Sequence, residues 1–132
     1  MKIEVIYEGD LHTIATHTAS GQTLHTDAPK DNGGQGQTFS PTDLVAASLA
    51  SCIATLMGTY AENNDIDLRG MKLEIEKTMS QDTPRRIVKL ATLITLPKGI
   101  TEEQKVKLKK VAHSCPVQDS LHPDIEAPIT LI

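Results

Sequence analysis

Residues 40–52, SPTDLVAASLASC, predict the start of a long apolar helix. Ser40 suits the N-cap, Pro41 suits the first helical position, and Asp43 completes a capping box three residues after the cap. The apolar pattern continues to a stop signal at Asn63. Because nearly every face of this helix is apolar, we expect it to be buried all round. A domain of 132 residues has difficulty covering such a helix alone, so we expect a second subunit to cover it.

Short strands are predicted before this helix. Residues 1–7 alternate between apolar and polar side chains, and residues 11–17 and 22–28 have similar patterns separated by turn signals. Together they indicate an antiparallel meander. The next segment, residues 29–37 (PKDNGGQGQ), is a loop with two interpretations. It is either a plain linker or the rim of a site, and only its place before the apolar helix favours the second.

In the second half of the chain we predict two strands, then two helices, then a final strand. A Thr-Glu-Glu-Gln capping box opens one helix, and a Cys-Pro dipeptide opens a shorter one. Strand and helix runs are segregated, and no hairpin requires a parallel crossover. We therefore predict an α+β fold in a single domain, residues 1–132. The expected elements are strands at 71–80, 86–96 and 127–132, and helices starting at 102 and 116.

The composition excludes several classes of partner. Lys and Arg number 13 against 17 Asp and Glu, which gives a net charge of −4, and aromatic residues make up 2% of the chain. Binding of nucleic acid needs clustered cations or stacking aromatics, so we expect no nucleic-acid partner. No apolar run reaches the roughly 18 residues that span a bilayer, and residues 1–4 do not begin a signal peptide. We predict no membrane partner and a cytoplasmic location, where thiols stay reduced.

The two cysteines have different local environments. Pro116 makes Cys115 the predicted N-cap of a helix, where backbone N–H groups can lower a thiol pKa. The equally weighted alternative is that Cys115 is a small buried apolar residue. Cys52 lies about three turns inside the apolar helix, beyond the reach of the helix dipole. A thiol buried without a partner is inert, so Cys52 is a structural residue unless the fold brings a cation to it.

Other familiar motifs of catalysis and metal binding are missing. The chain has no GxSxG, P-loop, HExxH or CxxC sequence. His12, His17 and His25 lie on predicted strands, too scattered to predict a metal site. His113 precedes Cys115 by two residues and is either a tuning group or a surface histidine. We predict no metal and no cofactor.

Two segments together resemble the OsmC/Ohr family, the osmotically inducible protein C and organic hydroperoxide resistance proteins. They are SPTDLVAASLASC, ending at Cys52, and CPVQDSL, starting at Cys115, with the cysteines 63 residues apart in the sequence. The resemblance implies an OsmC-like intertwined homodimer. In that fold, antiparallel sheets wrap two long, buried central helices, one from each subunit.

The resemblance also implies an activity. Better-studied members of the family are thiol-dependent peroxidases that reduce organic hydroperoxides in oxidative-stress defence. By position, Cys52 would attack the peroxide and become a sulfenic acid, Cys115 would resolve it as a disulfide, and a dithiol reductant would restore both thiols. The helix-end argument instead favours Cys115 as the reactive thiolate. We follow the resemblance for these roles.

Two departures from the peroxidase pattern qualify this implication. Peroxidase members carry a glutamate where this chain has Thr42, followed by Asp43, and they supply an arginine from the N-terminal strands. This chain has no arginine before Arg69. Asp43 would have to replace the acid, although it is one place later and rotated by about 100° around the helix, and Arg86 or Arg85 would have to replace the cation. Thr42 is a possible supporting residue beside it.

The chain is therefore closer to the less characterised OsmC-like branch. One alternative is an OsmC-like dimer that binds or senses a small apolar ligand without peroxidase turnover. Another is a stress-related dimer without small-molecule chemistry.

Overall fold

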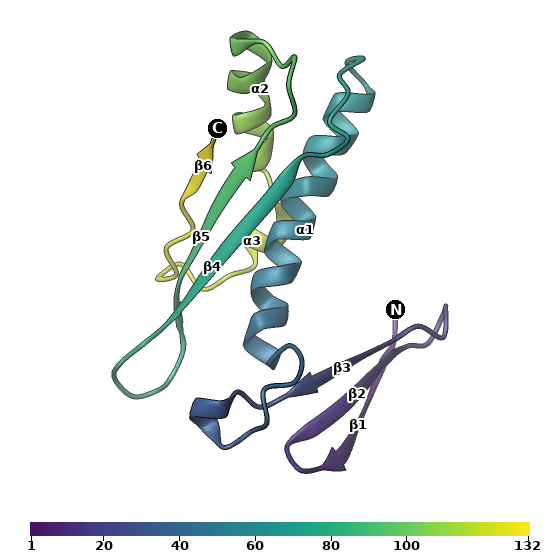
Figure 1. The fold of residues 1–132 in the computed structure, drawn as a ribbon, viewed down its shortest axis with the longest axis vertical. Helices are drawn as coiled ribbons and strands as arrows, with labels where there is room; N and C mark the ends of the chain where they lie inside the picture. The colour runs from purple at the N-terminus through teal and green to yellow at the C-terminus, as the bar shows by residue number, and fades with distance from the viewer. The chain divides into compact units, whose positions relative to one another are not determined.

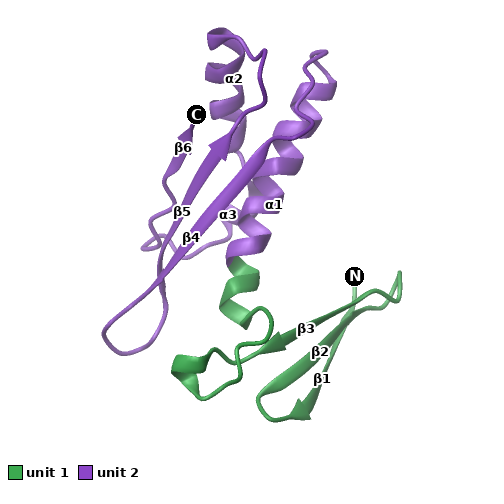
Figure 2. Ribbon diagram, viewed as in Figure 1, with its two compact units in different colours: residues 1–45 green, residues 46–132 purple.

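The computed structural model describes residues 1–132 and divides them into two compact units, residues 1–45 and residues 46–132 (Figure 2). Helices and strands follow one another in the predicted order, and their mixture is the predicted α+β class. The prediction of one domain over the whole chain stays a prediction.

The first unit contains the predicted antiparallel meander. Strands β1 (Ile3–Gly9), β2 (His12–His17) and β3 (Thr23–Asp27) pair in the order β1-β2-β3 (Figure 1). A β-bulge interrupts the first pair: Tyr7 lies opposite Thr13 and Gly9 opposite His12, so Glu8 is an extra residue on β1. Such bulges redirect the side chains next to them.

The segment after β3 folds back on the end of that strand. It contains the 3-10 turn η1 (Lys30–Asn32), and the Gly34 N–H donates to the Pro29 carbonyl at 3.0 Å. A Cβ at Gly34 would lie 1.7 Å from the Ala28 carbonyl oxygen, so this close approach requires glycine. The Gln37 N–H donates to Asp27 Oδ2 at 3.0 Å. Residues 29–37 are therefore more than a plain linker, because they are tied to the sheet.

The second unit combines a mixed sheet with three helices, α1 (Pro41–Glu62), α2 (Glu102–Ala112) and α3 (Pro116–Asp119); α1 begins in the first unit. Its strands β4 (Lys72–Met79), β5 (Ile87–Thr95) and β6 (Ile129–Leu131) pair in the order β4-β5-β6. β4 and β5 are antiparallel, as predicted, but β6 runs parallel to β5. The expectation of antiparallel sheets without a parallel crossover is wrong here, because α2 and α3 form a crossover between β5 and β6 (Figure 1).

The predicted start of α1 is confirmed. The Ser40 N–H donates to Asp43 Oδ2 at 2.8 Å, and the Asp43 N–H donates to the Ser40 hydroxyl at 3.1 Å. These are the two hydrogen bonds of a capping box, which satisfy N–H groups that a helix start leaves without intrahelical partners. The helix ends at Glu62, directly before Asn63.

The burial of α1 differs from the prediction. Its buried side chains form one stripe: Ala46, Leu49, Ile53, Met57 and Ala61. Hydroxyl residues form an exposed stripe, and the hydroxyls of Ser51, Thr55 and Thr59 donate to carbonyls one turn earlier in the helix. The expectation that α1 is buried on every face is therefore wrong within a single chain. Serine and threonine line one of its faces, and that face is exposed.

Helix α1 is also long and apolar enough to span a bilayer by length and composition. An 18-residue window within Pro41–Glu62 has a mean hydropathy of 1.6, which corrects the expectation that no run in the sequence reaches this length. Serine and threonine interrupt the run of apolar residues but lower the mean hydropathy of the helix only a little. One such helix is weak support for a membrane span, because core helices of soluble proteins have the same properties.

The apolar core of the chain lies in the second unit. It is built from one stripe of α1, the inward face of β5 and one side of α2, which supplies Leu108 and Ala112. Alternation along β5 places Leu90, Thr92 and Ile94 on the buried face. The largest fully buried side chains are Leu49, Ile53, Met57, Leu90, Ile94, Leu108 and Cys115. One of the two cysteines is thus part of this core.

Candidate active site

Cys115 occupies the N-cap of α3, as the Cys-Pro sequence predicts. Its backbone is extended (φ −79°, ψ 119°), Pro116 follows at the first helical position, and the residue is 0% exposed. The proline fixes a φ that suits the helix, so the local sequence determines where α3 begins. The thiol therefore lies at the junction between a helix end and the apolar core.

Cys52 approaches this thiol from α1. It lies one residue before the buried Ile53 and is itself only partly buried. Its side chain is close enough to the Cys115 thiol to act on the pKa of that thiol, and both cysteines are free. The fold thus brings together two thiols that are 63 residues apart in the sequence (52 and 115), both within the second unit.

The electrostatic environment of Cys115 opposes the helix-end prediction. Burial raises the pKa of the Cys115 thiol, and the hydrogen bond with Cys52 raises it further. The backbone N–H groups of Gln118 and Val117 lower this pKa, but by less. The thiol makes no capping hydrogen bond, and α3 has four residues, so the helix end acts on it weakly. Of the two interpretations of Cys115, the structure favours the small buried apolar residue over the depressed pKa, because burial outweighs the helix N-terminus.

Two arginines are paired with aspartates. Arg86 Nη1 lies 2.7 Å from Asp82 Oδ1 in the connection between β4 and β5. Arg69 Nη2 lies 2.6 Å from Asp67 Oδ2, and hydrogen bonds from Arg69 lower the pKa of Asp67 to about 2. Arg85 is exposed in the same connection as Arg86. The fold thus places the Arg86 guanidinium, a candidate cation for Cys52, in an ion pair of its own.

Thr42 and Asp43 lie at the start of α1. The Thr42 hydroxyl is 3.2 Å from the Ser40 hydroxyl, and the Asp43 carboxylate accepts the Ser40 N–H at 2.8 Å. Both residues therefore take part in the polar network that caps the helix carrying Cys52. The capping role therefore explains an acidic residue at position 43 without requiring that Asp43 take part in a reaction.

Sequence reasoning missed one residue beside the thiols. Gln118, three residues after Cys115, acts on its thiol through the backbone N–H, and its side-chain Oε1 is buried with no hydrogen-bond partner. A buried carbonyl oxygen without a donor is costly and rare, so it marks a polar point within the core. Its only sequence signal is its place at the third position of a helix that begins after a cysteine.

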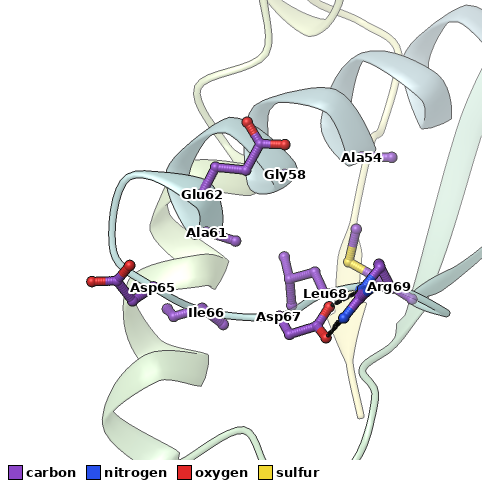
Figure 3. Close-up of a pocket in the computed structure, with 10 residues that line it drawn as sticks. Ala54, Gly58, Ala61, Glu62, Asp65, Ile66, Asp67, Leu68 and Arg69 are labelled. Atoms are coloured by element: carbon purple, nitrogen blue, oxygen red, sulfur yellow. Dashed lines mark hydrogen bonds and ion pairs between the residues drawn. The ribbon is translucent and has the colours of Figure 1, made fainter.

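A hollow of about 580 Å³ lies along the C-terminal half of α1 (Figure 3). Ala54, Gly58 and Ala61, the smallest residue types, line the helix side, and the segment from 65 to 71 supplies the other wall. The apolar residues of that segment are Ile66, Leu68 and Met71. The charged residues of the lining are Glu62 on the helix and Asp65, Asp67 and Arg69 on the segment. Neither cysteine lines the hollow, so it is separate from the thiol pair.

Comparison with known proteins identifies the family. The model of a family described as OsmC-like protein matches residues 34–129, which include both cysteines and the capping box of α1. The chain belongs to the OsmC-like protein family. The resemblance found in SPTDLVAASLASC and CPVQDSL is thereby confirmed. No curated protein matches the chain.

Solved structures share the OsmC-like fold over its whole length. A protein of Psychrobacter arcticus 273-4, named for osmotic stress induction and detoxification response, is 40% identical with a TM-score of 0.95, covering 100% of this chain and 96% of that one. An organic hydroperoxide resistance protein OsmC of Legionella pneumophila is 17% identical (TM-score 0.79; coverage 98% and 94%). The organic hydroperoxide resistance protein OhrB of Bacillus subtilis is 19% identical (TM-score 0.73; coverage 99% and 96%).

Proposed function

We propose that this OsmC-like protein is a thiol-dependent peroxidase that reduces organic hydroperoxides in oxidative-stress defence. The observation that carries the proposal is the proximity of the two thiols, close enough for the Cys52 side chain to shift the pKa of Cys115. Two thiols this close can form a disulfide with little movement of the chain. Relatives of the same fold are named for organic hydroperoxide resistance, which supports the choice of substrate class.

The proposed reaction has three steps. The Cys52 thiolate attacks the O–O bond of the hydroperoxide, the sulfur becomes a sulfenic acid, and the other oxygen leaves as an alcohol after protonation. The Cys115 thiol then attacks the sulfenic sulfur, which forms the Cys52–Cys115 disulfide and releases water. A dithiol reductant finally takes up the oxidising equivalents, becomes a disulfide itself and returns both cysteines to thiols.

The division of roles follows from exposure and charge. Cys115 is 0% exposed and burial raises its thiol pKa, so it suits the second, resolving step. Cys52 is partly exposed, which suits the residue that meets the peroxide. Arg85 or Arg86 remains the proposed cation near Cys52, and Thr42 and Asp43 the proposed supporting residues. For Arg86, this requires release of the ion pair with Asp82.

We further propose that the protein acts as an intertwined homodimer in the cytoplasm. Members of the family are commonly dimeric. Within one chain, apolar side chains of β1 stay uncovered: Ile3 is 60% exposed and Val5 62%. A second subunit that covers these side chains and the exposed stripe of α1 would remove them from water.

The test is consumption of cumene hydroperoxide and hydrogen peroxide by the reduced protein, with dithiothreitol as reductant. Turnover should be abolished by Cys52→Ser, whereas Cys115→Ser should give one turnover per chain and then stop. Ser51→Ala, an exposed neighbour on α1, is the matched control and should keep full turnover. The reverse pattern for the two cysteines would exchange their roles, and consumption no faster than free thiols would refute the peroxidase.

The hollow along α1 favours a second candidate, an OsmC-like dimer that binds or senses a small apolar ligand without turnover. A Cβ at Gly58 would meet nothing within 4 Å, so Gly58→Leu can fill this hollow. Native mass spectrometry should find a co-purified ligand on the wild-type protein and lose it in Gly58→Leu. A peroxidase that is active and carries no ligand would exclude this candidate.

A further inference from the structure

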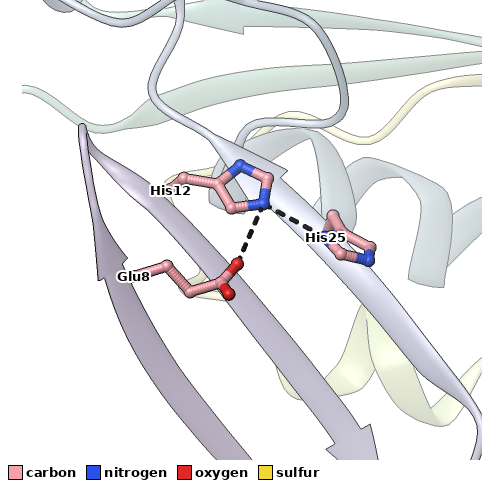
Figure 4. A group of neighbouring side chains, drawn as sticks. All are labelled: Glu8, His12 and His25. Carbon is pink, nitrogen blue, oxygen red and sulfur yellow. Dashed lines mark hydrogen bonds and ion pairs between the residues drawn. The ribbon is translucent and has the colours of Figure 1, made fainter.

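Three side chains with metal-binding atoms meet on the first unit's sheet (Figure 4). His12 Nε2 lies 3.0 Å from His25 Nδ1 and 3.5 Å from Glu8 Oε1. The nearest ligand atoms of all three residues lie within 4.8 Å of one another. His12 and His25, which look scattered in the sequence, therefore lie side by side in the fold.

The register of the sheet explains this convergence. His12 pairs with Asp27 across β2 and β3, and His25 lies two residues before Asp27, so all three side chains share one face. The bulge on β1 places Glu8 beside Gly9, the residue opposite His12. Each of the three strands thus contributes one potential ligand. Sequence spacing hides this arrangement, because pairing between strands, and not a helical repeat, brings the residues together.

A buried carboxylate orients the central histidine. Asp27 Oδ1 lies 2.5 Å from His12 Nδ1, and Asp27 Oδ2 accepts the Gln37 N–H at 3.0 Å. Asp27 is 5% exposed, and its carboxylate accepts a hydrogen bond from the His12 ring. Because a carboxylate accepts, this contact places the His12 ring proton on Nδ1 and leaves the Nε2 lone pair facing Glu8 and His25. Histidines that bind metals usually have such a carboxylate or carbonyl partner.

We propose that Glu8, His12 and His25 bind one divalent transition-metal ion, with Zn²⁺ as the matching probe. Tetrahedral Zn²⁺ holds nitrogen and oxygen ligands at about 2.0–2.1 Å, so two ligands are about 3.3 Å apart. The 3.0 Å and 3.5 Å separations at His12 Nε2 lie on either side of that value. Glu8 and His25 are exposed, so their side chains can rotate to complete the geometry.

The fourth ligand position can be reached from solvent. A pocket of about 340 Å³ is lined by Glu8, His12 and Asp27, with Gln35 and Gln37 from the segment after β3 on its rim. Water or a small anion can therefore reach the ion. Two imidazoles, one carboxylate and one open position form the donor set of many catalytic zinc sites.

The competing explanation is a proton in place of the metal. A His25 ring with its proton on Nδ1 would donate that proton to His12 Nε2 and would account for the 3.0 Å contact without an ion. Titration of metal-free protein with ZnCl₂, followed by calorimetry, separates the two. The full chain must carry no histidine tag, since a tag binds Zn²⁺ itself.

We expect one Zn²⁺ per chain. His25→Ala and Glu8→Gln should each weaken binding at least about tenfold, and Asp27→Asn by about 10–100-fold through loss of the orienting carboxylate. The matched control is His17→Ala, a β2 histidine bonded to Ser20 outside the cluster, which should bind as tightly as the wild type. Absence of stoichiometric binding, or equal weakening in His17→Ala, would overturn the site.

The thiols are the other place where Zn²⁺ could bind. The double variant Cys52→Ser, Cys115→Ser should therefore keep the full affinity, and loss of binding in it would place the ion at the thiols and overturn the proposal. Thermal unfolding provides a further readout, because a ligand that binds only the folded state stabilises it. Zn²⁺ should raise the Tm of this double variant by more than it raises the Tm of the same double variant with His25→Ala added.

Discussion

The two compact units of this chain are stabilised in different ways. The second unit buries apolar side chains from α1, β5 and α2, and seven of its larger side chains are fully buried. In the first unit the buried residues are Thr26, Asp27 and Ser40, all of them polar. Along β1, Ile3, Val5 and Tyr7 share one face of the strand and are each at least 60% exposed.

This contrast indicates what each unit needs from its surroundings. A three-stranded sheet is stable alone only when a hydrophobic face is covered. The first unit has sheet hydrogen bonds and the Asp27 network but no apolar core of its own, so its sheet needs cover from outside the unit. The proposed dimer would supply that cover, and the proposed metal ion would join all three strands. The second unit holds both thiols and has its own core.

The largest expected effect comes from a matched pair of substitutions, one in each unit. Ile94→Ala removes a fully buried side chain from β5 and should lower the free energy of unfolding by about 2–5 kcal/mol at any protein concentration. Ile3→Ala removes a side chain that is 60% exposed and should cost within about 0.5 kcal/mol in the monomer. Its cost should rise with protein concentration, as the proposed dimer forms and covers β1.

Urea unfolding at several protein concentrations, with sedimentation to follow the dimer, measures both variants. Equal costs for Ile3→Ala and Ile94→Ala in dilute protein would mean that the first unit has a core of its own. A monomer at all concentrations would remove the proposed cover.

A smaller effect is expected where the two units meet in sequence, at the start of α1. Ser40→Ala removes the side chain that caps the Asp43 N–H and should lower the free energy of unfolding by about 1 kcal/mol. Ser51→Ala, an exposed hydroxyl in the same helix, is the control and should change it by less than about 0.5 kcal/mol. Thermal and urea unfolding of both variants check this. Equal effects would mean that the capping box contributes nothing to the helix.

The smallest effect concerns pH and belongs to the second unit. The pKa of the Cys115 thiol is raised in the folded chain, so folded and unfolded forms bind this proton equally below the unfolded pKa of about 8.5. As pH rises further, the unfolded thiol ionises first, and the free energy of unfolding falls until the folded pKa is passed. Urea unfolding of reduced protein between pH 8 and 10 should show this slope. Cys115→Ala should flatten it, and an unchanged slope in that variant would contradict the raised pKa.

Sequence alone predicted the local structure well. Ser40, Pro41 and Asp43 located the start of α1, and Pro116 located that of α3, because caps and prolines act on the backbone beside them. The OsmC-like family followed from two segments around the cysteines.

Long-range arrangements were not predictable in the same way. The parallel β6, the Glu8–His12–His25 cluster and the raised pKa of Cys115 depend on strand register and burial. These properties arise from residues far apart in the sequence. The exposed stripe of α1 was missed because serine and threonine spaced around an apolar helix hardly change its average hydropathy.

The position of α1 along the chain has a consequence for biosynthesis. Residues 41–62 leave the ribosome before β4, β5 and β6, and β6 ends about 70 residues later, at Leu131. At about 5–20 residues per second, translation of that length takes about 4–14 s. For about the first half of this interval, until β5 ends at Thr95, the most hydrophobic helix of the nascent chain lacks the strand β5 that completes its core. Chaperones and targeting factors that recognise apolar helices therefore have their longest opportunity at α1.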